Sequence, residues 1–257
     1  MHRMLAIAAL GFSILAVPPA HATGPGEPFG NGNTGCTPDT RAHLQCADKL
    51  ITALNRLLLT LTTCHKEQVD YCFYQTIFDF VGCEATGKAA FDKRVASAAP
   101  LCSQTQLDDA NAYAAVLLAD STTPGSLKAR NAESYCDPTT GKPLEKDLSG
   151  FLPPTATVNT QEGAVWRNLR TLANAVLRCH KTMADTTFAG RTFDDGICSH
   201  HDPLRHRAAL DKYDTFVDRT TAKAVPPSCI DNASQKALGD AFVAKLENDN
   251  AMFYPCP

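Results

Sequence analysis

The stretch Leu61-Thr62-Thr63-Cys64-His65-Lys66 resembles Val176-Leu177-Arg178-Cys179-His180-Lys181, which stands 115 residues further along the chain. At the same offset Cys83 corresponds to Cys198, and residues 88–93 (KAAFDK) match residues 207–212 (RAALDK) after an insertion of four. Matching sequence blocks, separated by cysteines that occur in the same order, indicate two divergent copies of one unit. Each half then has a cysteine that closes a proline-containing stretch and a cysteine that ends the half. These are Cys102 and Cys136 in the first half, and Cys229 and Cys256 in the second.

The hydrophobic period within each copy is helical. We expect one long amphipathic helix to open each copy, the first from about residues 37–39 and the second with Thr160 as its N-cap. The next helix of the second copy is expected to begin with Asp202 as N-cap and Pro203 at its first position. Third helices are expected at residues 104–120 and 232–249. Alternating strand patterns are scarce, so the predicted fold class is all-α. The periodic apolar positions are Ile51, Leu54, Leu58 and Leu61 in the first copy, and Val165, Leu169, Leu172 and Val176 in the second.

The predicted organisation is two divergent copies of a disulfide-stapled three-helix unit joined by a linker rich in proline and glycine. The first unit covers residues 37–136 and the second covers residues 160–257. Residues 137–159 form the linker, because their six prolines and glycines interrupt any regular element. Residues 23–36 are rich in glycine and asparagine, and we expect them to be a flexible leader that buries nothing.

The first residues predict an exported protein. A basic start, Met1-His2-Arg3-Met4, precedes an apolar run over residues 5–17 and an A-x-A-like cleavage site after Ala22. Residues 1–22 are therefore a predicted signal peptide, and the mature chain is expected in the periplasm or outside the cell. No later stretch approaches the roughly 18 apolar residues of a transmembrane helix. The formal net charge is −3 with both signs interspersed, which argues against a nucleic-acid partner. A protein or a component of the cell envelope is the expected partner class.

All eleven cysteines lie beyond Ala22, and no C-x-x-C pair occurs, so they indicate a disulfide framework. The first two cysteines of each copy are 19 residues apart in both copies, which predicts the pairs Cys64–Cys83 and Cys179–Cys198. The same logic predicts Cys102–Cys136 and Cys229–Cys256, which would tie each second helix to the end of its unit. Three cysteines belong only to the first copy. For these we favour Cys36–Cys46, with Cys72 as the odd thiol, either a redox nucleophile, an intermolecular bridge, a buried bystander or the partner of Cys46.

The densest ionisable cluster lies between Ser199 and His206. Its imidazoles, His200, His201 and His206, are candidate ligands for a metal such as zinc. Their spacing does not place two imidazoles on one helix face, and Asp202 is well placed to cap a helix instead. No cofactor is predicted.

Two further histidines recur in both copies beside lysines, at His65 and His180. Such a recurrence fits either a shared anion-binding role or, more simply, cations in the last turn of a helix, where they meet its partial negative charge. Trp166 lies beside the apolar stripe of its helix, so we expect it in the core rather than in a ligand site.

The Cys-His-Lys block, the next cysteine and the Lys-Ala-Ala-Phe-Asp-Lys block resemble the cysteine-rich helical repeats of uncharacterised secreted bacterial proteins. The likeness covers most of residues 46–256, and it implies export and disulfide-stapled helices without implying any site residue. Because the mature chain also has no G-x-S-x-G elbow and no EF-hand loop, we favour a non-catalytic structural or binding module. The alternative is a small metal-dependent or thiol enzyme that uses His200, His201 and His206, or Cys72.

Overall fold

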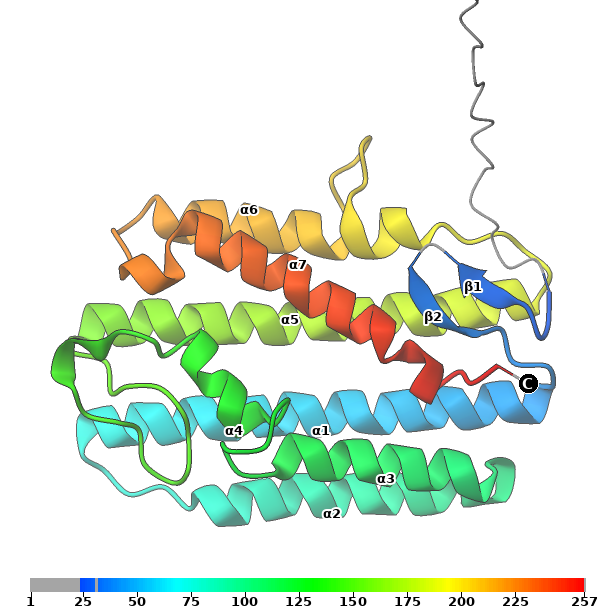
Figure 1. Ribbon diagram of the computed structural model, residues 1–257, viewed down its shortest axis with the longest axis horizontal. Coiled ribbons are helices and arrows are strands. Elements are labelled where there is room, and N and C mark those ends of the chain that lie inside the picture. Colours follow the sequence, from blue (N-terminus) through cyan, green and yellow to red (C-terminus); the bar gives the residue numbers. More distant parts are fainter. Residues whose placement is uncertain (1–23, 31, 257) are drawn as a thin grey trace, which may run out of the picture.

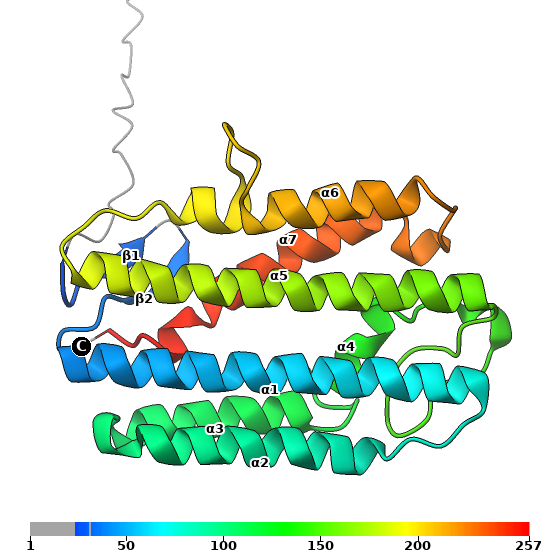
Figure 2. The same cartoon turned by 180° about the vertical axis from the view of Figure 1, so that it is seen from behind.

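The computed structural model describes residues 24–30 and 32–256, so the predicted signal peptide lies outside the described residues. Within the described chain the fold is all-α apart from a two-stranded sheet. The long helices lie side by side: α2 and α5 run antiparallel to α1, α6 runs antiparallel to α5, and α3 packs against α1 in the same direction as α1 (Figures 1 and 2). Helix α7 crosses one face of this array obliquely. The helices are α1 (Arg41–Tyr74), α2 (Phe80–Ala98), α3 (Gln104–Leu118), α4 (Leu127–Arg130), α5 (Ala156–Phe188), α6 (Ala209–Thr221) and α7 (Asn232–Asn248).

Helices α1 and α5 form the centre of the molecule because their leucine-rich stripes face each other. The stripe positions Leu54, Leu61 and Leu172 are each no more than 2 % exposed, and they belong to one continuous core. Burial of each such side chain contributes about 1.5–3 kcal/mol. The two predicted halves therefore share a single hydrophobic core rather than packing separately.

The predicted helix starts differ from the observed ones. Helix α1 begins at Arg41, and the side chain of Thr40 caps it by accepting from the amide of His43. Helix α5 begins at Ala156 with Thr155 as its N-cap, so the predicted cap Thr160 lies inside the helix. Thr155 takes this role because its backbone is extended and its hydroxyl accepts from the amide of Val158.

The predicted helix start at Asp202 is wrong. Its carboxylate does accept from the amides of Leu204 and Arg205, but these contacts close a turn in a loop that projects from the bundle (Figure 1). The chain then passes through a left-handed conformation at His206 (φ 50°), which ends any helical run. Helix α6 begins only at Ala209.

The predicted flexible leader is instead a β-hairpin. Strands β1 (Pro28–Gly30) and β2 (Asn33–Cys36) pair antiparallel, and Phe29 is buried against the ring of Tyr254. Gly35 (φ 98°) lies against the backbone of the C-terminal segment, and a Cβ atom at this position would approach the Tyr254 carbonyl oxygen to 2.6 Å. Three glycines with positive φ allow this hairpin, although residues 30–35 also have the spacing G-x-G-x-x-G of a dinucleotide-binding turn.

The predicted linker is packed rather than free. Leu144 and Leu148 are buried in the common core, and Ser149 donates from its hydroxyl to the backbone of the α4 segment. The last four residues of the predicted linker, 156–159, belong to α5.

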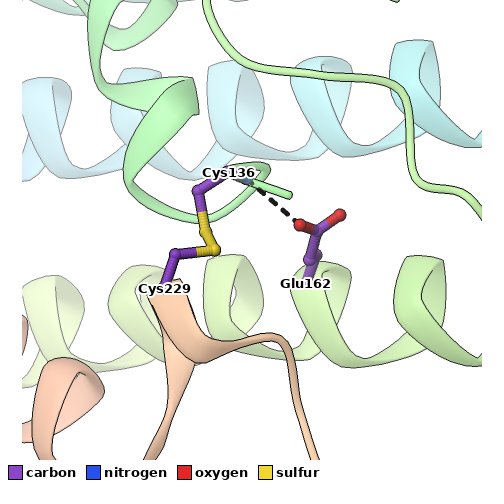
Figure 3. Close-up of side chains that lie close together, drawn as sticks. All are labelled: Cys136, Glu162 and Cys229. Carbon is purple, nitrogen blue, oxygen red and sulfur yellow. Dashed lines mark hydrogen bonds between the residues drawn. A yellow bond between two sulfur atoms is a disulfide. The ribbon is translucent and has the colours of Figure 1, made fainter. Parts of the chain in front are cut away.

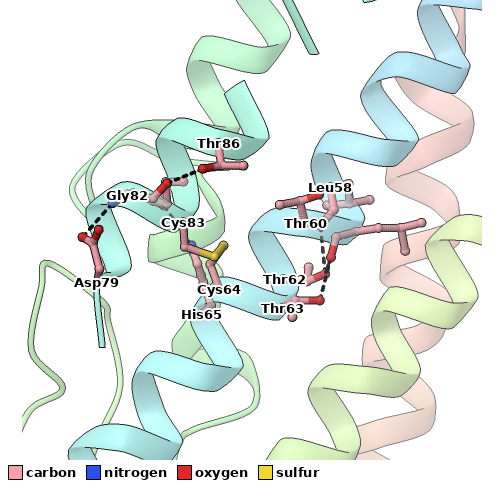
Figure 4. Close-up of a disulfide and its surroundings, with 12 residues drawn as sticks. Leu58, Thr60, Thr62, Thr63, Cys64, His65, Asp79, Gly82, Cys83 and Thr86 are labelled. Atoms are coloured by element: carbon pink, nitrogen blue, oxygen red, sulfur yellow. Dashed lines mark hydrogen bonds and ion pairs between the residues drawn. A yellow bond between two sulfur atoms is a disulfide. The ribbon is translucent and has the colours of Figure 1, made fainter. Parts of the chain in front are cut away.

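Five disulfides are formed, and two of them confirm the spacing argument. Cys64–Cys83 joins α1 to α2 (Figure 4), and Cys179–Cys198 joins α5 to the short π-helix Gly196–His200. The three other predicted pairs, Cys102–Cys136, Cys229–Cys256 and Cys36–Cys46, are wrong. The observed pairs are Cys46–Cys102, Cys136–Cys229 and Cys36–Cys256.

The packing of the chain explains two of these three corrections. Helix α2 runs back along α1, so Cys102, just past the end of α2, meets Cys46 in the early part of α1. The N-terminal hairpin lies beside the C-terminal segment, which brings Cys36 to Cys256. Neither of these pairs follows the predicted repeat, so the internal duplication stays a prediction from the sequence.

Candidate functional site

The three imidazoles of the predicted metal cluster are not brought together as one ligand set. His200 Nε2 lies 2.6 Å from Glu247 Oε1 of α7, and His201 Nδ1 lies 2.9 Å from Asp211 Oδ1 of α6. His206 is exposed on the projecting loop. The hydrogen bond that His200 donates to the carboxylate of Glu247 raises the pKa of His200. These histidines therefore join the 196–207 segment to two helices.

Cys72 is the cysteine outside the five disulfides, in agreement with the prediction for the odd thiol. Its half-buried sulfur receives a hydrogen bond from Gln68 and lies 4.0 Å from a carboxylate oxygen of Glu145. Burial raises the pKa of the Cys72 thiol. Because the thiolate is the nucleophile, these surroundings disfavour reactivity at this position.

His65 does not lie in the last turn of a helix, because α1 continues to Tyr74. It is fully buried, stacks on the ring of Trp166, and places Nε2 at 3.2 Å from Glu84 of α2. Glu84 in turn pairs with Lys128 of α4 at 3.3 Å. The cluster ties four helices together, and the core position predicted for Trp166 is confirmed.

His180 occupies the interior of α5 and is also fully buried, so neither histidine serves as a helix-end cation. Neither ring nitrogen of His180 has a hydrogen-bond partner among the described residues. Burial lowers the pKa of His180, while the nearby carboxylates of Asp195 and Glu247 act in the opposite direction. The imidazole is too deeply buried to meet a soluble ligand.

A hollow of about 570 Å³ lies between the start of α5 and the end of α6. We call it the α5/α6 groove. Its walls carry two cations, Arg167 and Lys223, the hydroxyl-bearing Thr160 and Thr220, and the ring of Phe216. Arg167 and Lys223 form no ion pair with any described residue, and no described carboxylate lines the groove.

In a second cationic hollow a lysine does have an acidic partner. It measures about 290 Å³ and contains Lys49, Arg94 and Lys181. Lys181 pairs with Asp48 at 2.7 Å within the same hollow, and Lys49 donates to a backbone carbonyl. Its positive charge is therefore partly neutralised by the protein itself.

A third hollow, of about 200 Å³, lies where the two chain ends meet. Its charged residues are Asp39, Asp109 and His43, and the carboxylate of Asp39 lies 2.5 Å from His43 Nδ1. This hollow is acidic and open. Of these three hollows, the α5/α6 groove is the one in which cations lie without an acidic partner among the described residues.

The groove is lined by one face of α5 and by residues at the end of α6 and just after it. Thr157, Thr160, Ala164 and Arg167 recur at intervals of three and four on α5, so a search for polar faces could have found them. Lys223 lies just past the end of α6, and only the packing of α6 on α5 brings it into the same groove as Arg167. Sequence reasoning missed both cations.

A buried carboxyl lies beside the groove. Gln161 of α5 donates to the carbonyl of Ala224 in the groove wall. The side chain of the next residue, Glu162, points toward Cys136. Its Oε1 accepts from the amides of Cys136 and Asp137, both at 3.1 Å (Figure 3). Burial raises the pKa of Glu162 to about 7, against the lowering effect of the two amides.

Comparison of the chain with protein-family models, with curated proteins and with solved structures finds no match. Within the described residues, no helix combines the length and the apolar character that a membrane crossing requires.

Proposed function

We propose that this chain is an exported, non-catalytic binding protein whose α5/α6 groove holds a small organic anion. The observation that carries the proposal is the pair Arg167 and Lys223, two cations that face one open groove without a carboxylate partner. Exposed cations in proteins are commonly found beside acidic side chains, as Lys66, Lys181 and Lys245 are here.

The groove offers the interactions that such a ligand needs. Arg167 can form a bidentate charge-assisted hydrogen bond with a carboxylate or phosphoryl group, and Lys223 supplies a second positive charge. Thr160 and Thr220 add hydroxyl donors, and Phe216 supplies an apolar surface for a carbon skeleton. Because the chain as a whole is negatively charged, the groove is a local exception that concentrates anions.

Export supports a role in capture outside the cytoplasm. The predicted signal peptide and the five disulfides are both typical of proteins that work in an oxidising compartment. A groove formed by covalently braced helices is also largely preorganised, which reduces the entropy cost of binding.

The test is calorimetric titration of the oxidised mature chain with citrate, with inorganic phosphate and with neutral glycerol at low ionic strength. We expect citrate to bind, glycerol not to bind, and the double variant Arg167→Gln/Lys223→Gln to lose at least about tenfold in citrate affinity. The matched control is Lys49→Gln/Arg94→Gln, which removes the same charge from the second cationic hollow.

Binding of inorganic phosphate as tight as that of citrate would identify a simple anion site in the same groove. The proposal fails if no anion binds, or if the control variant loses as much affinity as the groove variant, because the effect would then reflect net charge alone.

A further inference from the structure

Cys136–Cys229 differs from the other four disulfides in its access to solvent. In each of the others one sulfur belongs to a buried cysteine. Cys136 is half-buried and Cys229 is exposed, so an external thiol can reach this bridge. The buried cysteines of the other pairs are Cys36, Cys46, Cys64 and Cys179.

Glu162 places a carboxyl group against this bridge. One of its carboxylate oxygens and the two sulfurs all lie within 4.8 Å of one another (Figure 3). Oε1 accepts from the amides of Cys136 and Asp137, whereas Oε2 is buried with no hydrogen-bond partner in the part of the chain that the structure describes. A buried polar atom without a partner is costly, so its presence beside a reactive bond calls for an explanation.

The charged surroundings of Glu162 are few. Asp137 faces it from the loop and opposes its ionisation. Tyr135 has a buried hydroxyl with no partner among the described residues. It is close enough to Glu162, Asp70 and Arg167 to interact with their charges. Lys66 of α1 approaches Gly163 but is paired with Asp70. No cation with a direct contact to Glu162 is present among the described residues, so no neighbouring positive charge opposes the effect of burial, and the carboxyl holds its proton below about pH 7.

We propose that Cys136–Cys229 is a thiol-exchangeable disulfide and that Glu162 delivers a proton to Cys136 when the bridge opens. An external dithiol supplies the electrons. Its thiolate attacks the exposed sulfur of Cys229, the sulfur–sulfur bond breaks, and the electron pair goes to the sulfur of Cys136. That sulfur takes the proton of Glu162, and solvent then reprotonates the carboxylate.

The second step completes the balance. The remaining thiolate of the dithiol attacks its own sulfur in the mixed disulfide and leaves as a cyclic disulfide. Cys229 departs as a thiolate and takes a proton from solvent. The dithiol is oxidised and the protein bridge is reduced, by two electrons in each case.

Opening this bridge has a structural consequence. Cys229 anchors the segment between α6 and α7 to the end of the first half of the chain. The same segment carries Lys223 and Ala224 of the groove wall. Reduction therefore removes a covalent brace next to the groove. This inference rests on the surroundings of the disulfide and stands whether or not the groove binds an anion.

The test is limited reduction of the oxidised mature chain with dithiothreitol, followed by alkylation and peptide mapping. We expect Cys136–Cys229 to be reduced first, at least about tenfold faster than any other bridge. The rate constant per attacking thiolate is then measured between pH 5 and pH 9. It should fall by about tenfold or more as the pH rises through about 7, where Glu162 loses its proton.

Glu162→Gln keeps the size and the hydrogen-bond acceptor but carries no exchangeable acidic proton, so its profile should be flat. Glu145→Gln, which changes an exposed carboxylate in the nearby loop, should behave as the unaltered protein does. The inference is overturned if another bridge opens first, or if Glu162→Gln keeps the pH profile. Should Glu162→Gln not fold, a flat profile in the unaltered protein overturns it equally.

Discussion

The indole Nε1 of Trp166 donates a hydrogen bond of 2.7 Å to the backbone carbonyl of Thr62. This contact crosses from α5 to α1, the two helices that form the centre of the core, in a position that is 4 % exposed. The same ring stacks on His65 at a centroid distance of 5.9 Å. Trp166 of α5 thus pairs its indole N–H with α1 and packs its ring against His65 of the same helix.

Trp166→Phe should lower the free energy of unfolding by about 1–3 kcal/mol. The variant loses the hydrogen bond to Thr62 and leaves unfilled space beside His65. Urea unfolding of the oxidised protein measures the loss. Tyr74→Phe, at a position that is 61 % exposed, is the control and should change stability by less than about 0.5 kcal/mol. An equal loss in both variants would contradict this account of the α1–α5 contact.

Removal of the Cys36–Cys256 bridge should release the N-terminal hairpin. We expect Cys36→Ser/Cys256→Ser to destabilise the protein by about 2–5 kcal/mol, because the bridge closes a loop between positions 220 apart. Amide exchange should rise in residues 24–36 before it rises in α1. Cys72→Ser, which breaks no bridge, should leave both measurements unchanged. Protection that persists in the hairpin without the bridge would show that Phe29 and Asn33 hold it alone.

His180→Leu should make the protein more stable and less sensitive to acid. The two ring nitrogens of His180 are buried without partners, and their removal should gain about 1–3 kcal/mol at pH 7. Burial lowers the pKa of His180 from its ordinary value of 6.5, so the unfolded chain takes up the proton first as the pH falls. Stability is therefore lost below about pH 6.5, by up to about 1.4 kcal/mol per pH unit from this group.

The check is the slope of unfolding free energy against pH from 7.5 to 4.5 in the unaltered protein and in His180→Leu. His65, whose pKa is also lowered by burial, and Glu162, whose pKa is raised, remain in both proteins and contribute to the slope that persists. An unchanged slope in His180→Leu would show that this histidine is charged in the folded state.

Glu162→Gln should act in the opposite pH direction. The folded carboxyl has a pKa of about 7 against an ordinary value of 4.5, so the folded state holds the proton more tightly than the unfolded chain does. Stability from this group is therefore present below pH 4.5 and is lost as the pH rises toward 7, by at most about 3 kcal/mol. Glu162→Gln should remove this loss. Chemical denaturation at pH 4.5 and pH 8 measures it, with Glu145→Gln as the control. A larger loss in the variant than in the unaltered protein would show that Glu162 is ionised at neutral pH.

Local signals predicted the helices more reliably than their ends. The three-and-four spacing of Leu54, Leu58 and Leu61 correctly indicated a long helix, because that period depends only on the geometry of the helix itself. Thr155 and Thr160 are equally plausible caps by residue type, and the choice between them depends on which backbone is extended. The hairpin was missed because its short strands are held not only by their own pairing but also by the distant C-terminal segment, as in the hydrogen bond from the Cys36 amide to the Tyr254 carbonyl.

The sequence by itself determined the all-α class and the two bridges with 19-residue separations, because helix periodicity and short loop closure act over a few turns of chain. Only the tertiary structure decided the other three disulfides and the shared core. It also decided that Arg167 and Lys223 line one groove and that Glu162 lies against Cys136–Cys229. These depend on which antiparallel helices lie side by side. That choice rests on the summed burial of many side chains that are distant in sequence, and no short stretch of residues specifies it.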